Sequence, residues 1–189
     1  MRKLALAAAA LCVSTLGMAQ QEPPKWSYLE AGYMDFNPDE GLDDDGWFAG
    51  GSIGLFKALH IVAEYDDIGN YTLWNAGIGW HGLFGDPGDL YVQAVWNDVD
   101  LDIESDLGES DISDNGYEID AGIRWKVLKW LELKGQATWT DYDEAGSDVG
   151  GEVGALFTFL DDKLGFGVEY AVVNDADQAR GYFRWNLGR

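Results

Sequence analysis

The stretch that decides the fold is residues 117–126, YEIDAGIRWK, in which two incompatible surfaces alternate residue by residue. One parity is apolar and the other is charged or glycine: Tyr117, Ile119, Ala121, Ile123 and Trp125 against Glu118, Asp120, Gly122, Arg124 and Lys126. A helix would spread these charges around every side, whereas a period of two separates an apolar face from an ionic face. The stretch is therefore predicted to be a β-strand. An apolar face bounded by aromatics, opposite a face with both signs of charge, is typical of a transmembrane barrel strand.

The start of the chain has the composition of an export signal. Arg2 and Lys3 precede an apolar run, and the sequence GMA precedes an expected cleavage site after Ala19. The apolar run is too short to cross a bilayer as a helix. We therefore expect residues 1–19 to be a signal peptide and residues 20–189 to form one outer-membrane β-barrel domain.

Composition excludes several classes of function. The only cysteine, Cys12, lies in the expected signal, so the mature chain has no disulfide, thiol nucleophile or cysteine-based metal site. The net charge of −22 becomes −24 when Arg2 and Lys3 are removed. Such acidity argues against nucleic acid as a partner, because phosphate binding depends on lysine and arginine. The 25 glycines, 9 tryptophans and 9 tyrosines suit many strands with aromatic girdles.

Nine further segments repeat the alternation of residues 117–126, with nearly every charge on one parity. The fold class predicted is therefore all-β, an antiparallel up-and-down transmembrane β-barrel of ten strands, with eight strands as the alternative if the first and last segments are irregular. The ten segments are residues 26–36, 47–55, 59–66, 71–81, 90–97, 117–126, 131–140, 149–159, 164–172 and 178–187.

The connections between these segments alternate between two kinds, as the two ends of an up-and-down barrel require. One set is mostly short and the other is acidic: 56–58, 81–89, 127–129 and 160–163 against 37–46, 67–70, 98–115, 141–148 and 173–177. In outer-membrane barrels the short turns face the periplasm and the longer loops face outside. We expect Trp96, Trp139 and Tyr117 near the loop end, and Trp80 and Trp125 near the turn end.

The charged parity is expected to line the barrel interior as an ion network, because charges leaving water need partners. Its predicted members are Glu30, Glu64, Glu118, Asp120, Arg124, Glu132, Lys134, Glu152, Glu169, Arg180 and Arg184. Hairpin pairing brings Arg124 opposite Glu132 or Lys134, and Arg180 near Glu169. Two hypotheses follow: a cation-preferring pore, or a packed ionic core that plugs the barrel. We favour the plug, because much wider barrels are the ones that leave open channels.

The two histidines, His60 and His81, are predicted to point inward near the turn ends of neighbouring strands. With Glu64 nearby, such a pair has the chemistry to bind a metal ion or pass protons. No histidine is expected at the outer mouth, so no Ser/His/Asp set forms there. We favour a structural role in the lumen over a catalytic one.

The segment 98–114, DVDLDIESDLGESDISD, has eight acidic residues and no basic one. Asp98, Asp100 and Asp102 continue the parity of Trp96, so a strand edge projecting above the membrane would carry three carboxylates on one face. Carboxylates at this spacing are able to share a surface calcium ion. The alternative, which we favour, is a solvated, self-repelling and mobile loop without metal.

The whole mature chain resembles the small outer-membrane β-barrel superfamily in its signal peptide, its aromatic-ended strands and its YxEAGY start. Within that superfamily, residues 28–33 and 46–54 are similar to a diffusible-signal-factor-regulated small barrel family. The resemblance implies insertion by the barrel-assembly machinery, which commonly reads a terminal aromatic. It puts Phe183, Trp185 and Leu187 in the place of that signal, although Gly188 and Arg189 follow them.

These features predict a monomeric protein of the Gram-negative outer membrane, exported through the periplasm, with no cofactor. We expect a structural, adhesion or envelope-integrity role with a charged, largely filled interior and no enzymatic activity. A narrow cation-preferring channel is the alternative, and an outer-membrane lipid- or peptide-modifying enzyme is the second alternative. The expected partners are outer-membrane lipid and lipopolysaccharide.

Overall fold

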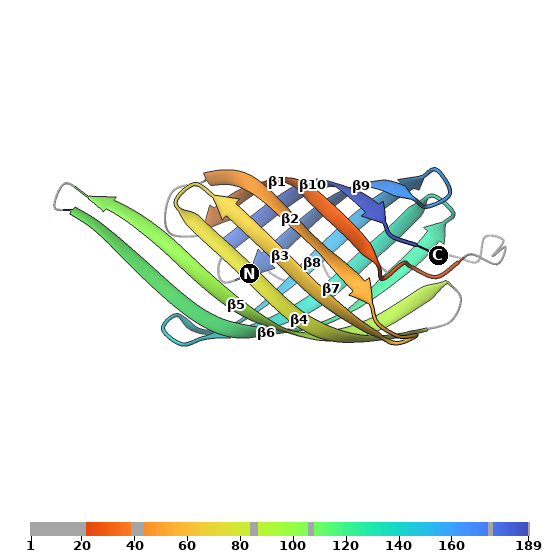
Figure 1. Ribbon diagram of the computed structural model, residues 1–189, viewed down its shortest axis with the longest axis horizontal. Helices are drawn as coiled ribbons and strands as arrows, with labels where there is room; N and C mark the ends of the chain where they lie inside the picture. Colours follow the sequence, from red (N-terminus) through yellow and green to blue (C-terminus); the bar gives the residue numbers. More distant parts are fainter. Residues whose placement is uncertain (1–21, 39–43, 84–86, 106–107, 174–175, 189) are drawn as a thin grey trace, which may run out of the picture.

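Ten antiparallel strands run in chain order around a closed barrel, and β1 pairs with β10 to complete it (Figure 1). The computed structural model describes residues 22–38, 44–83, 87–105, 108–173 and 176–188, so the expected signal peptide lies outside the described part. The strands are β1 (Tyr28–Pro38), β2 (Asp44–Gly54), β3 (Leu59–Ile68), β4 (Tyr71–Leu83), β5 (Gly88–Ser105), β6 (Gly108–Leu128), β7 (Leu131–Tyr142), β8 (Gly146–Phe159), β9 (Leu164–Val173) and β10 (Ala176–Asn186). The predicted ten-stranded up-and-down barrel is confirmed, and the eight-stranded alternative is wrong.

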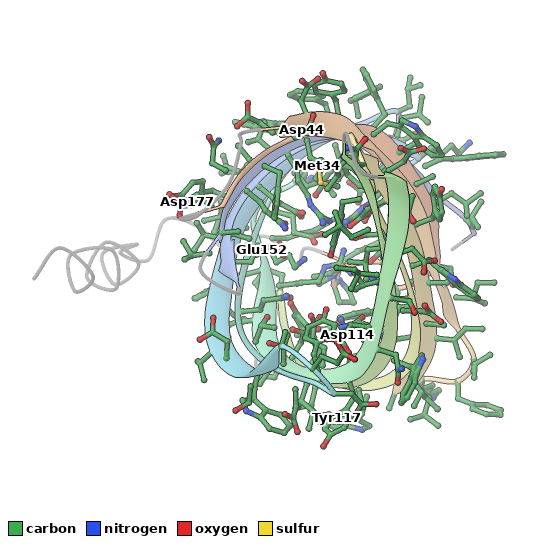
Figure 2. All side chains as sticks on the ribbon, turned by 90° about the vertical axis from the view of Figure 1, so that its left-hand side faces the viewer. Met34, Asp44, Asp114, Tyr117, Glu152 and Asp177 are labelled. Carbon is green, nitrogen blue, oxygen red and sulfur yellow. The ribbon has the colours of Figure 1, made fainter. Side chains whose placement is uncertain are left out.

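Side chains alternate between the outer wall and the lumen with the predicted period of two. In β6, Tyr117 and Trp125 are 45% and 37% exposed, whereas Asp120 and Arg124 are only 1% and 3% exposed. Figure 2, seen from the end of the barrel with the long β5–β6 hairpin, shows Tyr117 outside the wall and Glu152 inside it. The molecule is thus inverted relative to a water-soluble protein, with its ionic residues enclosed.

The outer wall is covered with large apolar side chains. Trp47, Trp74, Trp80, Trp96 and Trp185 are each between 49% and 56% exposed. A contiguous apolar surface of this extent is unfavourable in water and marks contact with another apolar phase. No helix in the described part of the chain is both long and apolar enough to cross a membrane.

The β5–β6 hairpin is longer than the sequence predicted. Residues 98–105 and 108–115 are paired strand, in a register that runs from Asp98 opposite Asn115 to Ser105 opposite Gly108. The favoured prediction of a loop is therefore wrong for these residues, which form a projecting pair of strands as in the alternative (Figure 1). Repulsion between carboxylates in water is screened within about 10 Å, and it does not outweigh pairing of the backbone.

One part of the lumen is apolar, which the charge pattern did not predict. Met34, Phe48, Ile68, Leu156 and Tyr182 form a buried cluster inside the barrel. Partly buried hydrophobic residues pack against this cluster: Phe36 and Tyr71. The cluster draws on β1, β2, β3, β8 and β10 and fills space that the ionic side chains leave free, so the interior is partly a hydrophobic core.

Candidate functional site in the barrel interior

The turn end of the barrel is occupied by the segment that precedes β1. The sequence predicted Trp26 as the first residue of the first strand, but β1 begins at Tyr28 and Trp26 turns into the lumen, where it is 9% exposed. Its indole Nε1 donates a hydrogen bond of 2.7 Å to Asp89 Oδ2, and its carbonyl accepts one from Ser52. The Arg124 guanidinium lies 4.6 Å from the ring centroid of Trp26. These contacts fix an aromatic plug across one end.

Both histidines contact this plug, on the strands that the sequence predicted. The rings of His60 and His81 stack on Trp26 with centroid separations of 4.4 Å each. Their Nδ1 atoms lie 3.0 Å apart, so one ring donates a hydrogen bond to the other. Glu64 lies elsewhere in the lumen, in an ion pair with Arg180. Among the residues that the structure describes, no group of three or more histidines and acids is arranged to hold a metal ion.

Next to the plug, two arginine–glutamate pairs lie in the lumen, each between neighbouring strands. Arg124 Nε lies 2.6 Å from Glu132 Oε1, and Arg184 lies 2.6 Å from Glu30. The Tyr28 ring lies between the two guanidinium groups, 4.0 Å from that of Arg184 and 5.5 Å from that of Arg124. Both arginines and Glu132 are at most 4% exposed in their side chains. Each charge in this layer is therefore buried and paired with an opposite charge.

At middle height, Lys134 binds two carboxylates from β8 and β9. Its Nζ lies 2.7 Å from Glu152 and 3.8 Å from Glu169. The Tyr182 hydroxyl donates a further hydrogen bond of 2.7 Å to Glu169. The lysine charge is therefore shared between two acids.

The ion-pair partners of Arg180 differ from the predicted neighbour, Glu169. The register does place it opposite Glu169, but its guanidinium reaches across the lumen to Glu64, at 2.8 Å, and to Asp66, at 3.2 Å. The Phe48 ring packs under the guanidinium, with its centroid 4.9 Å away. Arg180 thus ties β10 to β3 through the interior.

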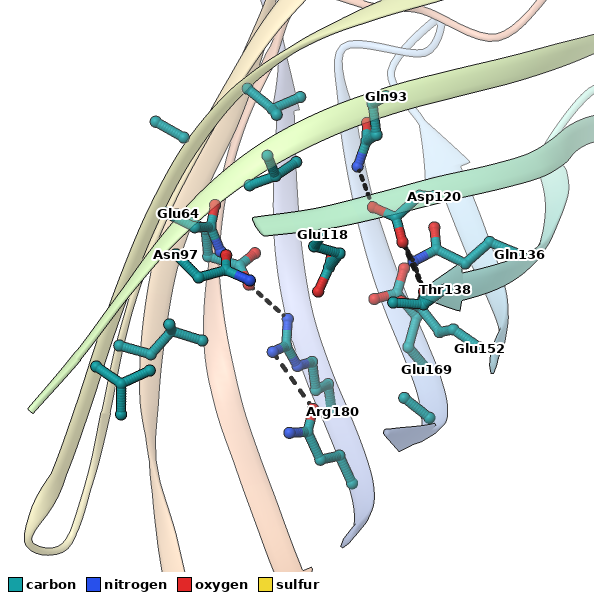
Figure 3. Close-up of a pocket in the computed structure, with 18 of the residues that line it drawn as sticks. Glu64, Gln93, Asn97, Glu118, Asp120, Gln136, Thr138, Glu152, Glu169 and Arg180 are labelled. Atoms are coloured by element: carbon teal, nitrogen blue, oxygen red, sulfur yellow. Dashed lines mark hydrogen bonds and ion pairs between the residues drawn. The ribbon is translucent and has the colours of Figure 1, made fainter. Parts of the chain in front are cut away.

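Two acids on β6 have no basic partner within ion-pair distance in the described part of the chain. Asp120 accepts hydrogen bonds from neutral donors only: Gln93 Nε2 at 2.9 Å, Thr138 Oγ1 at 2.6 Å and Gln136 Nε2 at 3.2 Å. Glu118 lies beside Asp120, carboxyl to carboxyl. In Figure 3, Glu118 lies between Asp120 on one side and Glu64 with Arg180 on the other, and all four residues line the cavity described below.

The β8–β9 turn folds over the rim of the turn end, a contact that the sequence did not reveal. Residues 160–162 all have positive φ, between 53° and 62°, which directs Asp162 back toward the barrel. Its carboxylate pairs with buried Lys126 and accepts a hydrogen bond from Thr158, and its backbone carbonyl accepts one from Asn186. Burial acts to raise the pKa of Asp162, but the bonds from Lys126 and Thr158 outweigh it and hold that pKa below its ordinary value.

Above the plug, the lumen holds a cavity of about 620 Å³. Its wall extends from Trp26 and Arg124 at one end to Ala145 and Asp148 in the β7–β8 hairpin at the other. Eight acidic and four basic residues line it in the described part of the chain: Glu30, Glu64, Asp114, Glu118, Asp120, Asp148, Glu152 and Glu169, with Arg124, Lys134, Arg180 and Arg184. The cavity is therefore an acidic chamber whose basic groups are all engaged.

The eleven charged residues that the sequence assigned to the interior all lie on the inward face, and ten of them line the cavity. Glu132 lies under the cavity wall, in its pair with Arg124. Asp98 and Asp100 lie on the outward parity of β5, and the side chain of Asp102 is outside the described part of the structure. The calcium site therefore stays an untested prediction.

No protein-family model matches the chain, and no curated protein matches it either. Solved structures similar in fold include the N-terminal β-barrel domain of OprF from Pseudomonas aeruginosa, which is 14% identical with a TM-score of 0.49, over 87% of this chain and 100% of that chain. The KdgM porin is 10% identical with a TM-score of 0.49, covering 84% and 99% of the two chains. Ail, the attachment invasion locus protein of Yersinia pestis, is 9% identical with a TM-score of 0.40, covering 84% and 94%.

Proposed function

We propose that the protein is a monomeric β-barrel of the Gram-negative outer membrane with a structural, adhesion or envelope-integrity role and without enzymatic activity. The observation that supports the location is the inverted distribution of side chains, with half-exposed tryptophans outside and ionic residues enclosed. Export through the periplasm, insertion by the barrel-assembly machinery, and contact with lipid and lipopolysaccharide belong to the same proposal. So does membership of the diffusible-signal-factor-regulated small barrel family.

The plug at the turn end favours a closed barrel over a pore. Trp26, His60, His81, Asp89 and Arg124 converge there, and each is at most 9% exposed. These five residues, called the floor from here on, form a packed layer of stacked rings and hydrogen bonds. Such a layer leaves little room for a continuous water path.

Three measurements test this function. The purified mature protein is expected to need detergent, to migrate faster on a gel when unheated than when boiled, and to show no discrete conductance steps in a planar bilayer. Solubility without detergent, together with a single gel position, would overturn the membrane assignment. Steady conductance steps would overturn the closed floor alone.

The acid-rich lining keeps a narrow cation-preferring channel as the second candidate. If the floor opens in the membrane, cations would pass carboxylates such as Glu118 and Glu152, which line the cavity. In that case, the conductance steps should be smaller and less cation-selective in a protein with Glu118→Gln and Glu152→Gln than in the wild type.

A further inference from the structure

The half of the cavity nearer the loops combines a large empty volume with acids that no protein cation balances. Asp120 is 1% exposed and is held by three neutral donors. Glu118 is enclosed by the barrel wall, points into the cavity, and has the Asp120 carboxyl as its neighbour (Figure 3). Two adjacent carboxyl groups in an enclosed site repel each other when both are ionised, so they either share a proton or attract a cation.

The basic side chains closest to this pair are committed to other acids. Arg180 is shared by Glu64 and Asp66, and Lys134 is shared by Glu152 and Glu169. Rotating either cation toward Glu118 would leave two other enclosed carboxylates without a cationic partner, which costs more than it gains. The chain therefore supplies no cation to this pair, and its negative charge is balanced either by a bound proton or by a bound cationic ligand.

We propose that this chamber binds a small aliphatic di- or polyamine, with one ammonium group at the Glu118–Asp120 pair. The proposal rests on the proposed function, because the floor must close the turn end so that the ligand enters from the loop side. A volume of about 620 Å³ is far larger than a bare ion needs, and suits a molecule of drug-like or smaller size. In the described residues no three acids and histidines are arranged around a metal position, which favours an organic cation over a divalent metal.

Other residues of the wall fit such a ligand. The cavity is lined on its loop side by uncharged side chains that offer acceptors for N–H groups and apolar area for methylenes: Tyr71, Leu73, Asn75, Asn97 and Tyr142. Asp148, at the far end of the lining, adds a carboxylate near the entrance. A net charge of −22 on the whole chain draws cations toward this opening.

The test is isothermal titration of spermidine into the full-length mature protein in neutral detergent micelles at low salt. Glu118→Gln should weaken binding at least about tenfold, since a hydrogen bond to a charged group is lost. Asp120→Asn should weaken it as well. The matched control is Glu144→Gln, which makes the same change in charge at an exposed residue of the β7–β8 connection outside the cavity lining.

Each other outcome argues against the proposal. Equal binding by wild type and Glu118→Gln would mean that the carboxyl pair shares a proton and holds no cation. Equal weakening by Glu144→Gln would show general attraction to an acidic surface. If magnesium chloride alone binds with the same dependence on Glu118, the ligand class is wrong.

A variant that still shows heat-modifiable migration keeps the membrane assignment intact, whatever the titration gives.

Discussion

Some charged side chains in this lumen pair with the facing residue, as Arg184 does with Glu30, whereas others find partners diagonally or across the barrel. Arg124 stands opposite Lys134 but binds Glu132, and Arg180 stands opposite Glu169 but binds Glu64. A guanidinium is planar and lies at the end of a long chain, so its reach exceeds the spacing of about 5 Å between strands. Register alone therefore does not select the pairs.

The Arg124–Glu132 pair should show the cost of leaving one buried charge alone. Both side chains are 4% exposed and lie 2.6 Å apart. Glu132→Ala is expected to lower the free energy of unfolding by about 3 kcal/mol or more, because the buried guanidinium of Arg124 stays charged after its carboxylate partner is removed. Urea unfolding in detergent, followed by tryptophan fluorescence, measures this. The double variant Arg124→Met/Glu132→Leu should recover most of the loss, and a double variant as unstable as the single one would contradict the argument.

Two glycines, one facing the lumen and one facing outward, test how tightly the interior is packed. A Cβ on Gly167 would overlap the ring of Tyr182, whereas a Cβ on Gly181 would meet nothing within 4 Å. Gly167→Ala should destabilise the barrel by roughly 1–3 kcal/mol through overpacking. Gly181→Ala should leave stability unchanged or raise it by about 0.5 kcal/mol, because it restricts the unfolded chain. The same urea unfolding compares the two, and equal effects would mean that the interior tolerates the extra methyl.

At the scale of strands and turns, the period of two predicted the facing of all ten strands. That prediction works because a shift of one residue along a strand would move every charged side chain to the apolar outer face. The pattern could not predict where pairing stops, so β5 and β6 extend beyond the predicted ends at residues 97 and 117. It also could not predict the inward turn of Trp26 or the Arg180–Glu64 pair, because both depend on contacts between distant parts of the chain.

The β8–β9 turn should make stability depend on pH in the acidic range. Since the pKa of Asp162 is lowered in the folded state, its contribution is present above the ordinary aspartate value of about 4 and is lost as pH falls through the folded pKa. The difference in unfolding free energy between wild type and Asp162→Asn should therefore be largest near pH 7 and should shrink below about pH 4. Asp161→Asn, at the exposed neighbour, is the control. A difference that stays constant with pH would show that Asp162 acts through its backbone bond alone.

At the scale of the whole molecule, the barrel has two unlike ends. The turn end carries the floor around Trp26, while the loop end carries the β5–β6 hairpin and the acidic part of the cavity (Figure 1). A cavity with one packed end is suited to holding a molecule, and a cavity with two open ends is suited to passing one. The choice between these functions therefore depends on the floor.

Removing the central ring of the floor should convert the closed barrel into a leaky one. Trp26 stacks on both histidines and lies 4.6 Å from the Arg124 guanidinium, so Trp26→Ala deletes the contact that the others share. Planar-bilayer recordings should be silent for wild type and should show discrete steps for Trp26→Ala, with cations preferred because eight acids face four bases along the cavity. Trp130→Ala, at a ring that is 50% exposed, is the matched control and should stay silent. If Trp26→Ala folds, shows heat-modifiable migration and is still silent, the ion pairs above the floor close the lumen by themselves. Closure then does not depend on the Trp26 ring.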